Sequence, residues 1–182
     1  MNSFLDIALV YHAAGLRVVP FSEAADGKKI FPKEYAKYRE AQSEADIRQL
    51  FARPSHGLAV LCTDNMEVID IDTKHDPKGS IAEDLLNSME SFGLKMPGVV
   101  QKTKSGGFHL IYRCPRPEGN QKLANRRGEK EAMIETRGPG GLVFVAPTPG
   151  YEFISGDILA IPEASQEDRD YLISICRHFN EP

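Results

Sequence analysis

Two aspartates separated by one residue, Asp70 and Asp72, end an apolar, β-branched stretch that begins at Met66. The stretch has the length and composition of a buried strand. Because strand side chains alternate between faces, the two carboxylates share one face, about 7 Å apart along the strand. Paired buried carboxylates need a compensating charge, and oxygen-only ligation suits Mg²⁺ or Mn²⁺. The pair indicates a divalent metal site, or alternatively a solvated pair at the exit of the strand.

A second cluster of polar residues lies in the segment 103–109, which contains a pair of glycines. Glycines allow a backbone to approach a ligand closely, and successive amides in such a turn form an anion-binding nest. Lys104 adds a cation, Ser105 a hydroxyl donor, and His109 a donor that can carry charge. These groups, together with the backbone at Gly106, suit a polyphosphate. The alternative is a strand histidine with a purely structural role.

A third stretch places Glu135 and Arg137 on one face of an expected strand, by the same two-residue period. Together with Asp70 and Asp72, Glu135 would complete a three-carboxylate cation site. Arg137 is suited to holding a phosphate through two parallel hydrogen bonds. The alternative for this pair is a salt bridge at an exposed sheet edge.

Apolar spacing, capping residues and breakers predict the elements that position these groups. Helices are expected over 3–14, 43–52, 80–92 and 165–179, with capping boxes at Ser43 and Ser80. The core face of the third helix is expected to carry Ile81, Leu85, Met89 and Phe92. Strands are expected over 16–21 (cut short at Pro20), 57–63, 66–72, 99–103, 107–113, 131–137, 142–146 and 151–154.

Two strand pairs follow from the turn residues between these strands. Asp64 and Asn65 predict a tight hairpin between 57–63 and 66–72. The glycine-rich turn at 138–141 predicts a pairing of the strands on either side of it, and 114–129 is expected to be a polar loop. Within 107–113, alternation places His109 on the face opposite Phe108. The mixture of strands and helices predicts an α/β or α+β fold.

The size of the chain is that of one domain or two closely joined halves. We expect a single domain over 1–182, with an N-terminal part at about 1–56, a metal- and nucleotide-binding part at 57–155, and an acidic C-terminal helix within 156–182. No run approaches 18 apolar residues, and the first residues lack the basic region of a signal peptide. Three widely spaced cysteines without a C-x-x-C pair predict reduced thiols in a cytoplasmic protein and no cysteine-rich zinc site.

The net charge of −4 conceals an uneven distribution. Residues 101–130 contain eight Lys or Arg and two Glu, a balance of +6, whereas 150–182 contain two Arg and seven Asp or Glu, a balance of −5. A basic segment of this kind indicates a surface for polyanions. The alternative is a solvated face without a ligand.

The three motifs, taken in order, resemble those of the archaeo-eukaryotic primase superfamily. They are similar to the motifs of the bifunctional primase–polymerase domain found in plasmid, phage and mobile-element replication proteins. The matching stretches are Val68–Asp72, Ser105–His109, and Ile134–Gly138 followed by Gly140–Pro147. The resemblance extends over about residues 4–155 and implies a mixed sheet with an RRM-like catalytic portion and flanking helices.

The resemblance also implies roles for the motif residues. Asp70, Asp72 and Glu135 would be the ligands of two catalytic divalent ions, Mg²⁺ or Mn²⁺. Ser105 and His109 would contact the phosphates of an incoming nucleoside triphosphate, with Lys104 and the backbone at Gly106 beside them, and Arg137 would be a further phosphate contact. Many relatives carry Asp at the position of Glu135, so this carboxylate is one methylene longer here.

The activity implied is template-dependent nucleotidyl transfer, as a DNA primase, a DNA polymerase or both, on a single-stranded DNA template with a primer. A helicase domain or protein is an expected partner, and a membrane is not. Candidates for contacts with the template backbone are Lys122, Arg126, Arg127 and Lys130. Two alternatives stay open: a catalytically inactive primase-like module that binds nucleotide or DNA within a replication initiator, and a metal-dependent glycosyltransferase that uses D-x-D to bind a nucleotide-sugar.

Overall fold

The computed structural model describes residues 3–76 and 79–181. Its α-helices are α1 (Phe4–Ala13), α2 (Glu44–Leu50), α3 (Ile81–Ser91) and α4 (Gln166–His178). Short 3₁₀ helices are η1 (Tyr35–Arg39), η2 (Thr73–His75) and η3 (Ile158–Ala160). The strands are β1 (Arg17–Glu23), β2 (Lys29–Ile30), β3 (Gly57–Leu61), β4 (Met66–Ile71), β5 (Val99–Lys102), β6 (Phe108–Arg113), β7 (Gln121–Asn125), β8 (Ala132–Arg137), β9 (Leu142–Val145) and β10 (Glu152–Ser155).

The strands form two sheets, which confirms the α+β class. The first sheet has the order β2-β1-β3-β9, and the second has the order β10-β5-β6-β4-β8-β7. Each pair of neighbouring strands in the two sheets is antiparallel, so the expected mixed sheet is not what these strands form. Short turns link β5 to β6 and β7 to β8, and such turns join antiparallel neighbours. The RRM-like arrangement stays a prediction.

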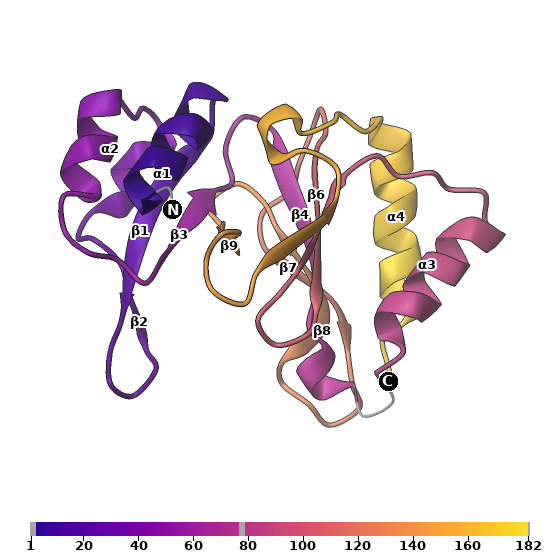
Figure 1. Ribbon diagram of the computed structural model, residues 1–182. Coiled ribbons are helices and arrows are strands. Elements are labelled where there is room, and N and C mark those ends of the chain that lie inside the picture. The colour runs from indigo at the N-terminus through magenta and orange to yellow at the C-terminus, as the bar shows by residue number, and fades with distance from the viewer. Residues whose placement is uncertain (1–2, 77–78, 182) are drawn as a thin grey trace.

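The helices lie at the two ends of the molecule (Figure 1). In the figure α1 and α2 accompany the four-stranded sheet, and α3 and α4 cover the outer face of the six-stranded sheet. Ser3 and Ser43 each form a complete capping box, as predicted for Ser43. The capping box predicted at Ser80 is wrong: its hydroxyl donates to Asp84, and the N–H of Ile81 is capped by Asp76 instead.

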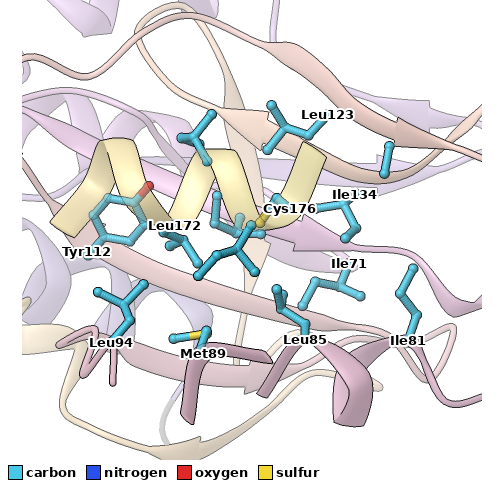
Figure 2. Packing of buried hydrophobic residues seen from close by; sticks show 14 of the residues in the cluster. Ile71, Ile81, Leu85, Met89, Leu94, Tyr112, Leu123, Ile134, Leu172 and Cys176 are labelled. Atoms are coloured by element: carbon cyan, nitrogen blue, oxygen red, sulfur yellow. The ribbon is translucent and has the colours of Figure 1, made fainter. Parts of the chain in front are cut away.

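The larger core lies between the six-stranded sheet and its two helices. Figure 2 shows Leu85 and Met89 of α3 and Leu172 of α4 close to Ile71 and the other buried strand residues. Phe92 was expected in this core but is 60% exposed. The helix ends at Ser91, and the chain turns at Gly93, so that Leu94 is the residue that returns to the core.

A second core joins the two sheets. It combines β4, β5 and β6 residues of the six-stranded sheet (Val68, Val99 and Ile111) with residues of β1, β3 and β9. Alternation along β4 therefore sends Ile69 and Ile71 toward the helices and Val68 toward the other sheet. Asp70 lies on the same face as Val68, so the predicted site faces the four-stranded sheet.

Two predicted strand pairs are wrong for the same physical reason. Asp64 and Asn65 do make a tight turn with positive φ angles, but β3 enters the four-stranded sheet and β4 the six-stranded one. Likewise β8 pairs with β4 and β7, whereas β9 pairs with β3. A turn can fix the local path of the chain, but apolar faces select the partner of each strand. These turns cross from one sheet to the other.

Two further predictions about strands need correction. β1 continues through Pro20, which lies opposite Leu58 on β3. The backbone N–H and C=O of Leu58 bond to the hydroxyl of Thr148 and not to Pro20. Pro20 therefore removes no ladder bond to β3. The expected polar loop at 114–129 contains β7, because Leu123 and Ala124 are buried where this strand pairs with β8.

Cys62, Cys114 and Cys176 are free and buried. Within the described parts of the chain, no helix is long and apolar enough to cross a bilayer.

Candidate active site

The predicted site residues stand in one row across the six-stranded sheet. Asp70 on β4 lies directly opposite His109 on β6 and, on its other side, directly opposite Glu135 on β8. The row continues outward to Gln101 on β5, opposite His109, and to Lys122 on β7, opposite Glu135. Directly opposite residues of antiparallel strands have neighbouring side chains on the same face. The sheet register therefore assembles three motifs that are far apart in the sequence.

A cavity of about 390 Å³ lies in front of this row. Asp70, Asp72, Ser105, His109 and Arg137 all line it. The opposite wall comes from the four-stranded sheet and from the loop before β10; the lining residues on that side are Phe31, Leu142, Val143, Phe144 and Tyr151. Five of the predicted site residues thus share one hollow between the two sheets.

Asp70 is held between two cationic or hydrogen-donating groups. Its Oδ1 lies 3.5 Å from Nε2 of His109, and its Oδ2 lies 3.6 Å from Nε of Arg137. Burial opposes ionisation of this carboxyl, but the contact with His109 and the charge of Arg137 outweigh it. The pKa of Asp70 consequently lies below its ordinary value, and the group is a carboxylate at neutral pH.

Asp72 is the first residue after β4 and caps the short helix η2. Its Oδ1 accepts the Lys74 backbone N–H at 3.0 Å, and its Oδ2 lies 2.9 Å from the Lys74 ammonium. The same ammonium pairs with Glu131 at 2.9 Å. These two carboxylates raise the pKa of Lys74. Asp72 is therefore fixed in place by local contacts while it lines the same cavity as Asp70.

Glu135 and Arg137 form the salt bridge that the sequence left as one alternative. The pair does not lie at a sheet edge, because β8 lies between β4 and β7. Arg137 contacts both Glu135 and Asp70 and so links the two carboxylates. Burial raises the pKa of Glu135; the charge of Arg137 counteracts this and that of Asp70 adds to it.

The residues of the second motif, in the turn between β5 and β6, do not all line the same cavity. Ser105 lines the cavity and contacts the Thr103 hydroxyl at 3.2 Å. Lys104 lines a neighbouring cavity of about 250 Å³ with Lys29 and His56, separated from the first by Phe144 and Tyr151. Gly106 turns the chain at a positive φ of 87°.

Gly107 is required by packing rather than by a ligand. A Cβ atom at this position would lie 2.1 Å from the carbonyl oxygen of Ile71, at the end of β4. The close approach of the two backbones therefore demands glycine here. Neither Gly106 nor Glu135 is among the residues that line the cavity in front of Asp70.

The carboxylate oxygens around Asp70 are the kind of donor that a divalent cation prefers. Among residues 3–76 and 79–181, no three histidine, cysteine or carboxylate side chains are already gathered as around one ion. Asp70 and Asp72 nonetheless present hard oxygen donors to one cavity, with Glu135 next to Asp70, and such donors fit Mg²⁺ or Mn²⁺. Arg137 and Lys74 balance the charge of these carboxylates in this structure.

A comparison with protein-family models identifies the chain. The Prim-Pol model, described as the N-terminal domain of bifunctional DNA primase/polymerases, matches residues 8–167 of the 182. The chain belongs to the Prim-Pol family. No curated protein matches it in sequence. Family membership supports a DNA primase/polymerase function, a nucleotidyltransferase activity, and binding of DNA and nucleotides.

Sequence reasoning missed several residues of the Prim-Pol site. Gln101 is fully buried and contacts His109, and a glutamine in a short apolar strand was the available signal. Phe31, Phe144 and Tyr151 form an aromatic wall: Phe31 stacks on Phe144 with ring centroids 6.0 Å apart, and Tyr151 lies 5.9 Å from Phe144. Burial, with the charges of Asp70 and Asp72, raises the pKa of Tyr151 to about 12. No motif in the sequence indicated this wall.

The four cations proposed for DNA contacts of the Prim-Pol domain lie on β7 and on the turn between β7 and β8. Lys122 lies opposite Glu135 in the row of predicted site residues, and its ammonium donates to the Lys130 carbonyl. Arg126 pairs with Glu181 at 3.7 Å, and the backbone N–H of Arg127 donates to the same carboxylate. Of these four residues, Lys122 is the one that the sheet register places in the same row as Asp70 and Glu135.

A separate open groove of about 430 Å³ lies on the four-stranded sheet. Among the described residues that line it, the charged ones are Lys33, Lys37 and Arg53, and it shares Phe31 with the cavity in front of Asp70. This groove is a cationic surface that adjoins the cavity in front of Asp70 at Phe31.

Proposed function

We propose that this Prim-Pol domain catalyses template-directed nucleotidyl transfer onto a DNA primer strand. The observation that supports the proposal is the row in which Asp70 stands directly between His109 and Glu135 at the edge of a cavity. Phosphoryl transfer depends on positioning and on charge stabilisation more than on covalent chemistry by the protein. The row and the cavity in front of it offer carboxylates for cations beside a histidine, a serine and an arginine for phosphates.

Each group has a separate role in this proposal. Asp70, Asp72 and Glu135 hold two divalent cations, Mg²⁺ or Mn²⁺, which when bound would activate the primer hydroxyl and neutralise charge on the triphosphate. Ser105, His109 and Arg137 donate hydrogen bonds to phosphate oxygens, with Lys104 as a more distant cation. Because Arg137 already bridges Asp70 and Glu135, it also orients both carboxylates.

The aromatic wall gives the nucleotide a place to lie. Phe31, Phe144 and Tyr151 face the carboxylates across the cavity, and aromatic rings stack on any base. Stacking of this kind contributes about 1–3 kcal/mol per base and is tolerant of sequence. A template-directed enzyme requires this tolerance, because the template selects the base.

The direct test is incorporation of labelled nucleotides on single-stranded DNA by the whole chain, with and without a primer, in Mg²⁺, Mn²⁺ or a chelator. Metal-dependent product is expected in the primed reactions, and the unprimed reactions show whether the domain also starts chains. Deoxynucleotides and ribonucleotides are supplied separately. Triphosphate binding without synthesis under any condition would favour the inactive binding module and contradict the proposal.

The glycosyltransferase alternative is tested by competition. Binding of a labelled nucleoside triphosphate is measured against an excess of unlabelled triphosphate or of nucleotide-sugar. We expect displacement by the triphosphate at concentrations where the nucleotide-sugar has no effect, because Ser105, His109 and Arg137 line the cavity. Their hydrogen-bond donors suit a triphosphate, which presents more phosphate oxygens and more negative charge than a nucleotide-sugar. Stronger displacement by the nucleotide-sugar would favour the alternative.

Charge reversal at Lys122 is expected to weaken the binding of single-stranded DNA and to reduce its dependence on salt. Each phosphate contact contributes about 0.7 to the slope of log K against log salt on a single strand. The measurement is a fluorescence titration with Lys122→Glu at several salt concentrations. Lys37→Glu, in the groove on the four-stranded sheet, is the matched control. If Lys37→Glu alone reduces the slope, the template crosses that groove instead.

A further inference from the structure

Gln101 joins the catalytic histidine to the backbone of the other sheet. Its side chain is completely buried and stands opposite His109 in the sheet register. Its Oε1 accepts the N–H of Ala146 at 2.7 Å, and its Nε2 donates to the carbonyl of Phe144 at 2.9 Å. The same Nε2 lies 3.0 Å from Nδ1 of His109. One buried amide thus contacts a backbone donor, a backbone acceptor and a ring nitrogen whose role as donor or acceptor depends on the tautomer.

The backbone decides which way the amide of Gln101 faces. A backbone N–H can only donate and a backbone carbonyl can only accept. If the amide were reversed, its NH₂ group would face the N–H of Ala146, and its oxygen would face the carbonyl of Phe144. Both contacts would be repulsive in a buried site. The nitrogen must therefore face Phe144 and His109.

The polarity of Gln101 in turn decides the polarity of His109. Because Nε2 of Gln101 is a donor, Nδ1 of His109 must accept and cannot carry the proton of the neutral ring. That proton resides on Nε2, which lies 3.5 Å from Oδ1 of Asp70. The opposite tautomer would place an N–H against the NH₂ of Gln101 and a lone pair against the carboxylate of Asp70.

We propose that Gln101 is a positioning residue that holds neutral His109 in the Nε2–H tautomer, so that the ring presents a hydrogen-bond donor to the cavity. His109 then binds anionic oxygens and does not act as a general base through Nε2. The catalytic consequence rests on the proposed function, whereas the tautomer is a property of the protein alone. The two are therefore tested separately.

The tautomer is read from the imidazole nitrogen shifts of ¹⁵N-histidine-labelled protein, without nucleotide, metal or DNA. The spectra are recorded at about pH 8.5, well above the ordinary histidine pKa of about 6.5, so that neutral rings are observed. Wild-type His109 is expected to show a protonated Nε2 and an unprotonated Nδ1. A protonated Nδ1 in the wild-type protein would overturn the proposal without any variant.

Two substitutions test the role of the amide. Gln101→Glu keeps an acceptor for Ala146 but replaces the donor that faces His109, so the proton is expected to move to Nδ1. Gln101→Met removes both polar groups, and a mixture of the two tautomers is expected. The matched control is Gln42, another buried glutamine, whose Oε1 accepts the N–H of Val18 and whose Nε2 donates to the Val18 carbonyl. Gln42→Glu and Gln42→Met should leave the His109 signals unchanged, and an unchanged tautomer in both Gln101 variants would refute the proposal.

Kinetics give the second readout. Gln101→Met is expected to lower the kcat of primed synthesis about 10–100-fold, the usual effect of losing the partner that orients a site residue. The KM for primed DNA should stay unchanged. An equal loss of kcat in Gln42→Met would show that the effect comes from general loss of stability, and it would remove the catalytic consequence. Absence of synthesis by the wild type would contradict the proposed function while the spectra still decide the tautomer.

Discussion

Replacement of Asp70 by asparagine is expected to lower nucleotide incorporation by more than about 100-fold. Loss of a residue that merely orients a metal ligand costs about 10–100-fold, and a ligand itself should cost more. Asp70 stands at the centre of the catalytic row and contacts both His109 and Arg137. Asparagine has the same shape but no charge, so the substitution removes the carboxylate while the space remains filled. The measurement is primed incorporation at saturating Mg²⁺ or Mn²⁺.

Stability must be measured alongside the activity of Asp70→Asn. Because the folded-state pKa of Asp70 lies below its ordinary value of about 3.9, its negative charge stabilises the folded state above that pH. This contribution is lost as the pH falls through the folded-state pKa. At neutral pH the variant lacks it, so a modest fall in Tm is expected with the fold retained.

The matched control is Glu152→Gln, a carboxamide substitution at an exposed position on β10 of the same sheet. Its activity should equal that of the wild type. If Asp70→Asn retained wild-type synthesis under conditions where it is folded, Asp70 would not be a catalytic ligand, and the proposed roles of the row would be wrong.

Replacement of Arg169 by methionine is expected to destabilise the protein by about 3–5 kcal/mol, the usual cost of leaving a buried charge unpaired. Arg169 on α4 is 3% exposed and binds the carboxylate of Glu67 on β4, which is completely buried. Nε and Nη2 of Arg169 lie 2.8 Å from the two carboxylate oxygens. The Tyr112 hydroxyl donates to Glu67 at 2.6 Å, and the N–H of Glu118 donates at 3.0 Å.

This loss corresponds to a fall in Tm of roughly 6–20 °C for a chain of this size. It is measured by thermal and urea unfolding. Arg177→Met on the same helix is the control, because the Arg177 side chain is exposed and bonds to Gln121. Its effect should stay within about 0.5 kcal/mol. Equal unfolding midpoints for the two variants would show that the buried pair does not hold α4 on the sheet.

The Arg169 prediction also concerns the part of α4 that lies beyond the family match. The family match stops at residue 167, just inside α4. Leu172, Ile173 and Cys176 of this helix nevertheless belong to the same core as Ile69 and Ile71 of β4. The acidic C-terminal helix therefore packs against the strand that carries Asp70, on the face of the sheet opposite the cavity.

Several features followed from local patterns in the sequence. The two-residue period of strands placed Asp70 and His109 on faces opposite to their apolar neighbours, and the structure agrees. Helix α2 begins at the predicted capping box because capping depends on four consecutive residues. The family was also identifiable from three short motifs in order. These features depend on residues that are close together along the chain.

The sequence by itself determined which face of a strand each polar residue of the motifs occupies, and the family to which the chain belongs. Tertiary structure alone decided that β4 lies between β6 and β8, which sets Asp70 opposite both His109 and Glu135. The pairing of β5 with β6 likewise brought Gln101 to His109. Strand partners are selected by the burial of whole apolar faces, over separations that no local pattern spans. For that reason the faces of these residues were predictable, and their row across the sheet was not.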